Sequence, residues 1–333
     1  MKESQEIDIV VTWVDDSDPI WRAKRAKYVG ESETEGNSVV RYRDWDTLRY
    51  WFRGVERFAP WVRYVYFVTD DQKPEWLNLD HPKLRWVKHT DFIPEEYLPT
   101  FCSDPIEWNM HRIEGLSDSF VYFNDDVFLI GETKAEDFFV DGVPCDYPSI
   151  GIQYATGQFS HMLFNNNALL NRHFSFKDSV KSDLSKWIKY QSLGGLLKLF
   201  MYGRKPLYPG SNSHHIQTSY RKSTFETLWD KEFDVIHKTC INKLRTVTDV
   251  TIYSVRDWQI LSGDFHPHKP LGRIFHTASL SYSDEALEFM RGGRGKVVCL
   301  NDSEDEQDFE THKKQIIAEF ERLFPEMSEY EIK

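Results

Sequence analysis

The sequence predicts an α/β fold in which a mostly parallel sheet is flanked by helices, with a largely helical insertion. Short runs of β-branched and aromatic residues recur over residues 7–130, as they do in buried parallel strands. Segments with apolar residues at helical spacing separate these runs, and this alternation is typical of right-handed crossovers. The 333 residues, 40% of them apolar, are enough to bury a sizeable core in one large domain or two ordinary ones.

The elements follow from these patterns. Strands are expected at residues 7–14 (IDIVVTWV), 62–69 (VRYVYFVT), 84–89 and 119–123. Residues 44–58 should form a helix with Asp44 as its N-cap, and a second helix should lie within 99–113. Further helices are expected at 184–201, with a bend at Gly194–Gly195, at 223–233 and at 305–323.

The composition of the chain disfavours several classes of function. The net charge of −12 and the pI near 5.5 show no basic footprint, so we expect no nucleic-acid partner. The four cysteines are far apart, which favours reduced thiols in a cytosolic protein over a secreted fold with two disulfides. We find neither a leader pattern nor an apolar run of transmembrane length. Peripheral membrane association stays open.

Acidic turns follow two of the expected strands. Asp15 and its neighbours come after the first strand, and Asn124-Asp125-Asp126 comes after the fourth. Ligands of open α/β sheets bind at the carboxyl ends of strands, and adjacent carboxylates there repel each other unless a cation offsets them. A hard cation such as Mg²⁺ prefers oxygen ligands. The alternative is a solvated surface turn, but a carboxylate pair between apolar strands is costly to bury without a partner.

Other chemistry-bearing residues lie outside these turns. The pair His214–His215 stands in a polar loop and could supply a base or a phosphate donor, although many such histidines are structural. Arg245 and Asp249 could pair with each other or meet a phosphate, which suits the planar guanidinium. Glu107 could act chemically or form an ordinary helix pair with His111. The chain has no GxSxG, Walker, GxGxxG or HExxH motif, which disfavours the enzymes that use them.

Four blocks of the sequence resemble the Stealth family, which comprises bacterial capsular and cell-wall polysaccharide phosphotransferases and the α/β subunit of N-acetylglucosamine-1-phosphotransferase. Together they cover about two thirds of the chain. The blocks are IDIVVTWVDDSDP (7–19), a long second block (43–129) that includes RDWDTLRYWF and LPTFCSDPIEWNMHRIEGLSDSFVYFNDDVFL, HHIQTSYRK to TDV (214–250) and VVCLNDSEDE to MSEYE (297–331). The third departs from the family, because His215-Ile216-Gln217 stands where many members have His-x-Pro.

The resemblance implies a glycosyltransferase-A-like, Rossmann-like core, a requirement for Mg²⁺ or Mn²⁺, and transfer of a sugar 1-phosphate from a nucleotide sugar to a glycan hydroxyl. It places functional positions of the family at Asp8, Glu107, Asp125, Asp126, His215, Arg245 and Asn301. We expect a UDP-linked hexose or N-acetylhexosamine as donor, although CDP or GDP would serve equally, and UMP as the leaving group. A cytoplasmic bacterial enzyme at the inner face of the plasma membrane is expected.

Roles can be assigned on this basis. Asp126, with Asp125 or Asp249, would hold the metal, and Arg245 would pair with the transferred phosphate. His215, or else Glu107, would take the acceptor proton. The nucleotide would meet Thr12, Trp13 and Asp15, with Asp8 and Asn301 as further binding positions.

The same reasoning divides the chain into three segments: residues 1–150 as the nucleotide-sugar half of the core, 151–205 as a helical insertion that faces the acceptor, and 206–333 as the second half of the core. Two other functions remain open: a metal-dependent glycosyltransferase that releases UDP, and a non-catalytic carbohydrate-binding protein.

Overall fold

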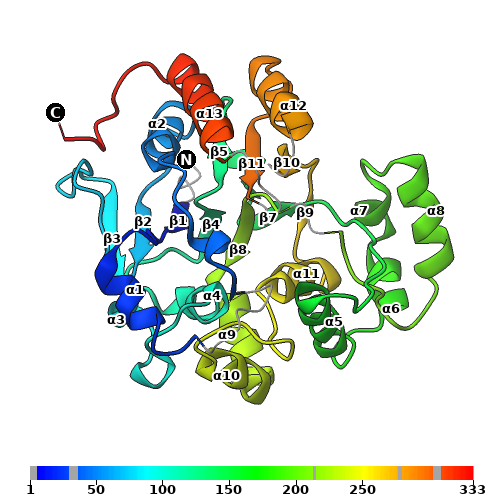
Figure 1. Cartoon of the computed structure of the whole chain (residues 1–333). Coiled ribbons are helices and arrows are strands. Elements are labelled where there is room, and N and C mark those ends of the chain that lie inside the picture. The colour runs from blue at the N-terminus through cyan, green and yellow to red at the C-terminus, as the bar shows by residue number, and fades with distance from the viewer. Residues whose placement is uncertain (1–5, 30–36, 213–214, 277–279, 303–308, 333) are drawn as a thin grey trace.

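The computed structural model describes residues 6–29, 37–212, 215–276, 280–302 and 309–332. A central sheet has the strand order β3-β2-β1-β4-β8 (Figure 1). Its strands are β1 (Asp8–Thr12), β2 (Val65–Thr69), β3 (Leu84–Lys88), β4 (Ser119–Asn124) and β8 (Thr218–Arg221). The first four are parallel, and β8 runs antiparallel to β4, with Thr218 opposite Tyr122. The predicted mostly parallel α/β sheet is confirmed.

Two three-stranded sheets extend this framework. In one, the order is β10-β11-β5, formed by Gly272–His276, Val297–Asn301 and Val127–Leu129; β11 is parallel to β10 and antiparallel to β5. The other has the order β6-β7-β9, formed by Phe139–Val140, Val143–Asp146 and His266–Pro267. Because β5 follows β4 after only Asp125 and Asp126, these two residues connect the central sheet to its neighbour.

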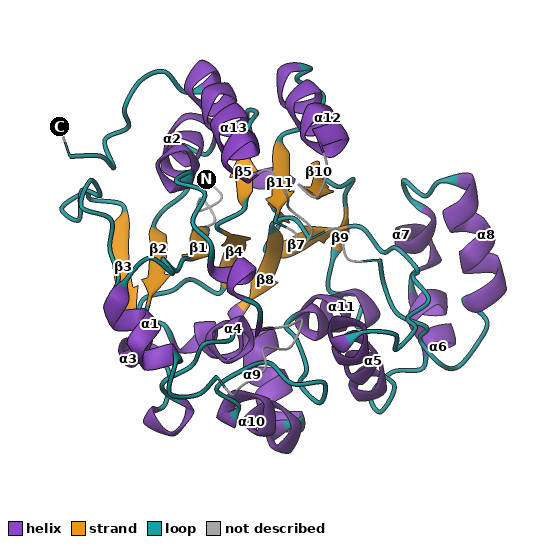
Figure 2. Cartoon of the chain, viewed as in Figure 1, coloured by secondary structure: helices purple, strands orange, loops and turns teal. Residues whose placement is uncertain are grey.

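Helices cover both faces of the central sheet (Figure 2). One side carries α2 (Leu48–Phe58), and next to it α12 (Leu280–Arg291) packs on β10 and β11 and α13 (Phe309–Leu323) packs on α12. The other side carries α4 (Ser103–Asn109), α9 (Lys222–Lys231), α10 (Phe233–Ile241) and α11 (Tyr253–Leu261). Alternate residues of β1 point to opposite faces, so that Ile9 and Val11 join one buried cluster and Val10 joins the other. Burial on both faces explains the continuous apolar run in the sequence.

A lobe of helices projects from one end of the molecule (Figure 1). It contains α6 (Phe176–Ser182), α7 (Leu184–Ile188) and α8 (Leu193–Tyr202), and it follows α5 (Gln158–Leu170), which packs on α11. The short helices α1 (Pro19–Arg25) and α3 (His89–Phe92) lie near the end of β3. No helix within the described ranges is both long and apolar enough to cross a bilayer.

Several local predictions need correction. Asp44 is not the N-cap of α2, because the helix begins at Leu48 after Thr47. The Gly194–Gly195 pair lies in the first turn of α8, and the break falls just before it, at residues 189–192. The helix expected at 223–233 is α9, which ends before α10 begins. Residues 305–308 of the last expected helix lie outside the described ranges.

Asp8 occupies the amino end of β1, opposite the edge at which the parallel strands end. Its buried carboxylate accepts hydrogen bonds from Arg63 Nε at 2.8 Å, Arg63 Nη2 at 2.5 Å and the Ser117 backbone amide at 2.8 Å. These contacts join β1 to the segments that lead into β2 and β4. The expectation that Asp8 binds a ligand is therefore corrected: the chain's own donors surround its carboxylate, which has a structural role.

Replacing Asp8 with Asn should lower the free energy of unfolding by about 2 kcal/mol, because Arg63 loses its buried counter-charge. The loss stays below that of a fully buried pair since the Arg63 side chain is 25% exposed. Urea unfolding measures it, with exposed Asp80→Asn as the control. Equal stability of the two variants would contradict this role.

Candidate active site

The strand order brings separate sequence segments to one edge of the sheet. β1, β2, β3 and β4 are parallel, so their carboxyl ends meet there. β8 is antiparallel, so the chain that enters it, including His215, lies at the same edge. Asn301 ends β11 beside this edge and lines the same cleft. The cleft has a volume of about 860 Å³, within the usual range for small-molecule sites.

Most of the predicted site residues line this one cleft. They are Thr12, Trp13, Glu107, Asp125, Asp126, His215, Arg245 and Asn301. They come from β1, α4, the β4–β5 turn, the entry to β8, the loop after α10 and β11. His214 lies outside the described residues.

Three carboxylates gather on one wall of the cleft. Burial raises the pKa of Asp125 to about 8, with further contributions from the negative charges of Asp126 and Asp44. Burial likewise raises the pKa of Asp44 to about 6, and nearby Asp46 and Asp15 add to it. Asp126 Oδ1 is buried and has no hydrogen-bond partner among the described residues. This wall is therefore short of positive charge and of hydrogen-bond donors.

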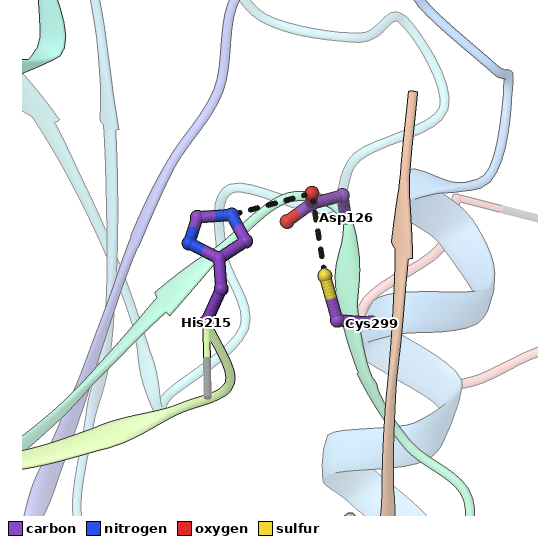
Figure 3. Close-up of side chains that lie close together, drawn as sticks. All are labelled: Asp126, His215 and Cys299. Carbon is purple, nitrogen blue, oxygen red and sulfur yellow. Dashed lines mark hydrogen bonds and ion pairs between the residues drawn. The ribbon is translucent and has the colours of Figure 1, made fainter. Parts of the chain in front are cut away.

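The imidazole of His215 points toward the carboxylate of Asp126 (Figure 3). Its Nε2 lies 3.7 Å from Asp126 Oδ2 and 3.4 Å from Asn124 Nδ2, and its Nδ1 lies 2.6 Å from the Tyr253 hydroxyl. Burial alone would lower the pKa of His215, but Tyr253 and Asp126 outweigh it, so the pKa lies well above its ordinary value. In the neutral ring, a proton on Nδ1 would donate to Tyr253 and leave the Nε2 lone pair facing the cleft.

The thiol of Cys299 donates to Asp126 Oδ2 at 3.5 Å (Figure 3). One ligand atom each from Asp126, His215 and Cys299 lies within 4.8 Å of the others. Burial raises the pKa of Cys299 well above its ordinary value, and Asp126 adds to this effect, so the sulfur is a neutral thiol. The group therefore brings one oxygen, one nitrogen and one sulfur atom close together. All four cysteines are free and buried.

Arg245 is held on another wall of the cleft. Its Nε donates to Asp104 Oδ2 at 3.2 Å and its Nη2 donates to Ser103 Oγ at 3.0 Å. Its backbone oxygen accepts from Asn37 at 3.0 Å and from Gln158 at 2.8 Å. These contacts fix the partly buried guanidinium beside α4, where it can meet an anionic ligand.

Glu107 begins a chain of polar side chains that reaches β1. Tyr122 donates to Glu107 Oε1 at 3.0 Å, and the Tyr122 hydroxyl lies 2.9 Å from Thr12 Oγ1. Burial raises the pKa of Glu107 to about 7, and the carboxylate of Asp104 raises it further, while Arg245 opposes the shift. Glu107 can therefore exchange a proton near neutral pH.

Two residues that were predicted to bind a metal or the nucleotide accept hydrogen bonds from their own turns. Asp249 accepts from Asn242 Nδ2 and from the Thr246 amide, both at 2.6 Å, and from Thr246 Oγ1 at 2.8 Å. Its expected role in metal binding is corrected, because it caps this turn. Asp15 Oδ1 accepts from the Ser17 amide at 2.8 Å, and Asp15 does not line the cleft, which corrects its expected contact with the nucleotide.

The site also contains residues that the sequence interpretation did not single out. They are Ser103, Asp104, Tyr122, Tyr253 and Cys299, together with Asp44, which was expected only as a helix cap. Asp44 and Asp104 stand inside the blocks that resemble the Stealth family, which is a signal that could have found them. Tyr253 lies outside those blocks and comes near His215 only through the packing of α11.

The chain is similar to several known proteins. Residues 5–33 match the model of Stealth protein conserved region 1, and residues 41–145 match conserved region 2. The chain is 38% identical to the receptor polysaccharide phosphotransferase WefC of Streptococcus oralis and to the capsular polysaccharide phosphotransferase WcwK of Streptococcus pneumoniae, in each case over 98% of this chain and 99% of the relative. The apo-form glycosyltransferase GlyE of S. pneumoniae is a similar solved structure, with a TM-score of 0.42 and 9% identity over 96% of this chain and 63% of that one.

Replacing Glu107 with Gln should flatten the pH dependence of stability. In the folded protein the Glu107 carboxyl has a pKa of about 7, whereas in the unfolded chain its pKa is the ordinary 4.5. Between pH 4.5 and pH 7 only the folded state keeps the proton, so stability falls as the pH rises through this range. We expect the wild-type free energy of unfolding to fall by up to about 3 kcal/mol more than that of the variant between pH 4 and pH 8.

Urea unfolding at several pH values provides the measurement, with exposed Glu226→Gln as the matched control. Parallel stability curves for the wild type and Glu107→Gln would show that this carboxyl is not perturbed.

Proposed function

The chain belongs to the Stealth family, and from this premise we propose that it transfers a sugar 1-phosphate from a nucleoside diphosphate sugar to a hydroxyl group of a glycan. The relatives are named polysaccharide phosphotransferases, which supports a phosphotransferase role in the synthesis of a capsule or another surface polysaccharide. The donor that we propose is a UDP-linked hexose or N-acetylhexosamine, and the products are a phosphodiester and UMP.

One observation carries the proposal: a single cleft combines a carboxylate wall, an imidazole and a partly buried guanidinium. Asp126, His215 and Arg245 come from distant parts of the chain, yet all line it. A sugar diphosphate needs its negative charge offset and its attacking group held in place, which these side chains can do. The volume of the cleft suits a nucleotide sugar.

The carboxylate wall fits a hard divalent cation. Asp126 Oδ1 is a buried oxygen without a partner among the described residues, and the negative charges of neighbouring carboxylates add to the effect of burial in raising the pKa values of Asp125 and Asp44. We propose that Asp126 and Asp125 hold Mg²⁺ or Mn²⁺. When bound, the cation would offset charge on the diphosphate and on the departing UMP.

The reaction would proceed by displacement at the β-phosphorus of the donor. The acceptor oxygen forms a bond to this phosphorus, the bond to the UMP oxygen breaks, and the acceptor proton passes to a base on the enzyme. His215 is the base that we propose, because its ring is oriented by Tyr253 and its Nε2 faces Asp126. A cation bound to Asp126 would offset the negative charge that helps to raise the pKa of His215, so that the neutral ring could accept the proton. Glu107 is the alternative base.

The remaining cleft residues would bind and orient the substrate. Arg245 would donate to the oxygens of the transferred phosphate. Thr12 and Trp13 would meet the nucleotide at the end of β1, where Trp13 Nε1 is a buried donor without a partner among the described residues. Asn301 would contribute from the end of β11.

Purified full-length protein, incubated with UDP-N-acetylglucosamine, Mg²⁺ and a panel of alkyl glycosides, should release UMP and form a glycoside that carries the sugar phosphate. Mass spectrometry of both products provides the measurement. Asp126→Asn and His215→Ala should each lower the rate at least about 10²-fold, whereas Asp15→Asn, a control carboxylate outside the cleft, should not.

Release of UDP with a glycosidic product would identify a glycosyltransferase instead. If glycan binds while UDP-, CDP- and GDP-linked sugars all stay intact, the protein is a carbohydrate-binding module. Wild-type rates in both cleft variants, with circular dichroism unchanged, would remove the assigned roles.

A further inference from the structure

The helical lobe formed by residues 176–207 exposes an apolar surface. α8 buries a single large side chain, Leu199, although most of its ten residues are apolar. Leu193 is 86% exposed and Phe200 is 63% exposed, and Leu197 lies between them at helical spacing. The exposed apolar side chains of the lobe are Leu184, Ile188, Tyr190, Leu193, Leu196, Leu197, Phe200, Met201 and Leu207. A cluster of this kind on one lobe marks an interaction surface.

The charge of the lobe is opposite to that of the rest of the chain. Residues 176–207 contain seven lysines and arginines and two aspartates, a net charge of +5, whereas the whole chain carries −12. The basic residues are Lys177, Lys181, Lys186, Lys189, Lys198, Arg204 and Lys205. Five of them are exposed, and the Arg204 guanidinium lies 4.9 Å from the ring centre of exposed Phe200. The occupant of this surface should therefore be apolar and negatively charged.

The position of the lobe leaves this surface open. α8 forms the outer edge of the lobe, on the side away from the central sheet (Figure 1). The lobe connects to the candidate active site through α5, because Phe159 in the first turn of α5 lines the cleft. A flat surface could meet α8 while the sheet and the cleft stay in water.

We propose that the lobe of residues 176–207 docks on an anionic lipid bilayer, with the apolar face of α8 lying in the headgroup region and the lysines and arginines meeting lipid phosphates. Apolar side chains beside basic ones are the pattern of helices that lie in a membrane interface. A second copy of the chain is less suited to this surface, because two such lobes, each with a charge of +5, would repel each other in a symmetric contact. This inference is independent of the reaction proposed for the cleft.

Vesicle flotation of the full-length protein tests the proposal. Vesicles of phosphatidylcholine with 30% phosphatidylglycerol should carry the protein, and pure phosphatidylcholine vesicles should carry much less. The double variant Leu197→Gln/Phe200→Ser should lower the bound fraction at least about tenfold by removing apolar surface. Lys177→Glu/Lys181→Glu should lower it as well, and 0.5 M NaCl should do the same to the wild type.

Phe233→Ser is the matched control, because Phe233 is a similarly exposed phenylalanine on α10, outside the lobe. It should float like the wild type. Flotation that is equal for the α8 double variant and the wild type, or absent from anionic vesicles, would overturn the proposal. A dimer in analytical ultracentrifugation that the double variant abolishes, together with no flotation, would identify a second copy as the occupant.

Discussion

The arrangement of the site depends on two consecutive carboxylates held where two sheets meet. Asp125 and Asp126 form the whole connection between β4 and β5, so the two strands fix the positions of their backbones. The backbone oxygen of Asp126 accepts from the Leu300 amide at 2.9 Å, which fixes the turn against β11. The chain thus keeps two carboxyl groups in a partly buried place where ionisation is costly, as the raised pKa of Asp125 indicates, and this cost is reduced when positive charge arrives.

The rest of the cleft is built around that wall in two parts. On one side His215 is held between Tyr253 and Asp126, and on the other Arg245 is held by Asp104 and Ser103. Each cationic or ionisable group is thereby positioned before a substrate enters. Such preorganisation reduces the reorganisation that transfer of a charged phosphate group would otherwise require. Asp8 and Arg63, at the opposite end of β1, differ from these residues. The two side chains pair with each other and stabilise the fold.

Sequence patterns predicted the elements of the core better than their ends. Apolar runs located β1 to β4, because burial on both faces leaves a clear signal, and the acidic turn after β4 lies in the cleft at the edge where the parallel strands end. Residue type alone could not show which carboxylates have oxygens that the chain's own donors leave available to a ligand. Asp249 and Asp8 look like ligands in the sequence, yet backbone amides and neighbouring side chains satisfy them. Tyr253 could not be found either, because only the packing of α11 brings it to His215.

Binding of Mn²⁺ to the purified protein, followed by electron paramagnetic resonance with and without UDP, tests the central claim most directly. The account predicts that the wild type binds Mn²⁺, more tightly when UDP is present, and that Asp126→Asn weakens this binding at least about tenfold. Asp249→Asn and Asp15→Asn should bind as the wild type does. Undiminished binding of Mn²⁺ by a folded Asp126→Asn variant would contradict the role of the carboxylate wall.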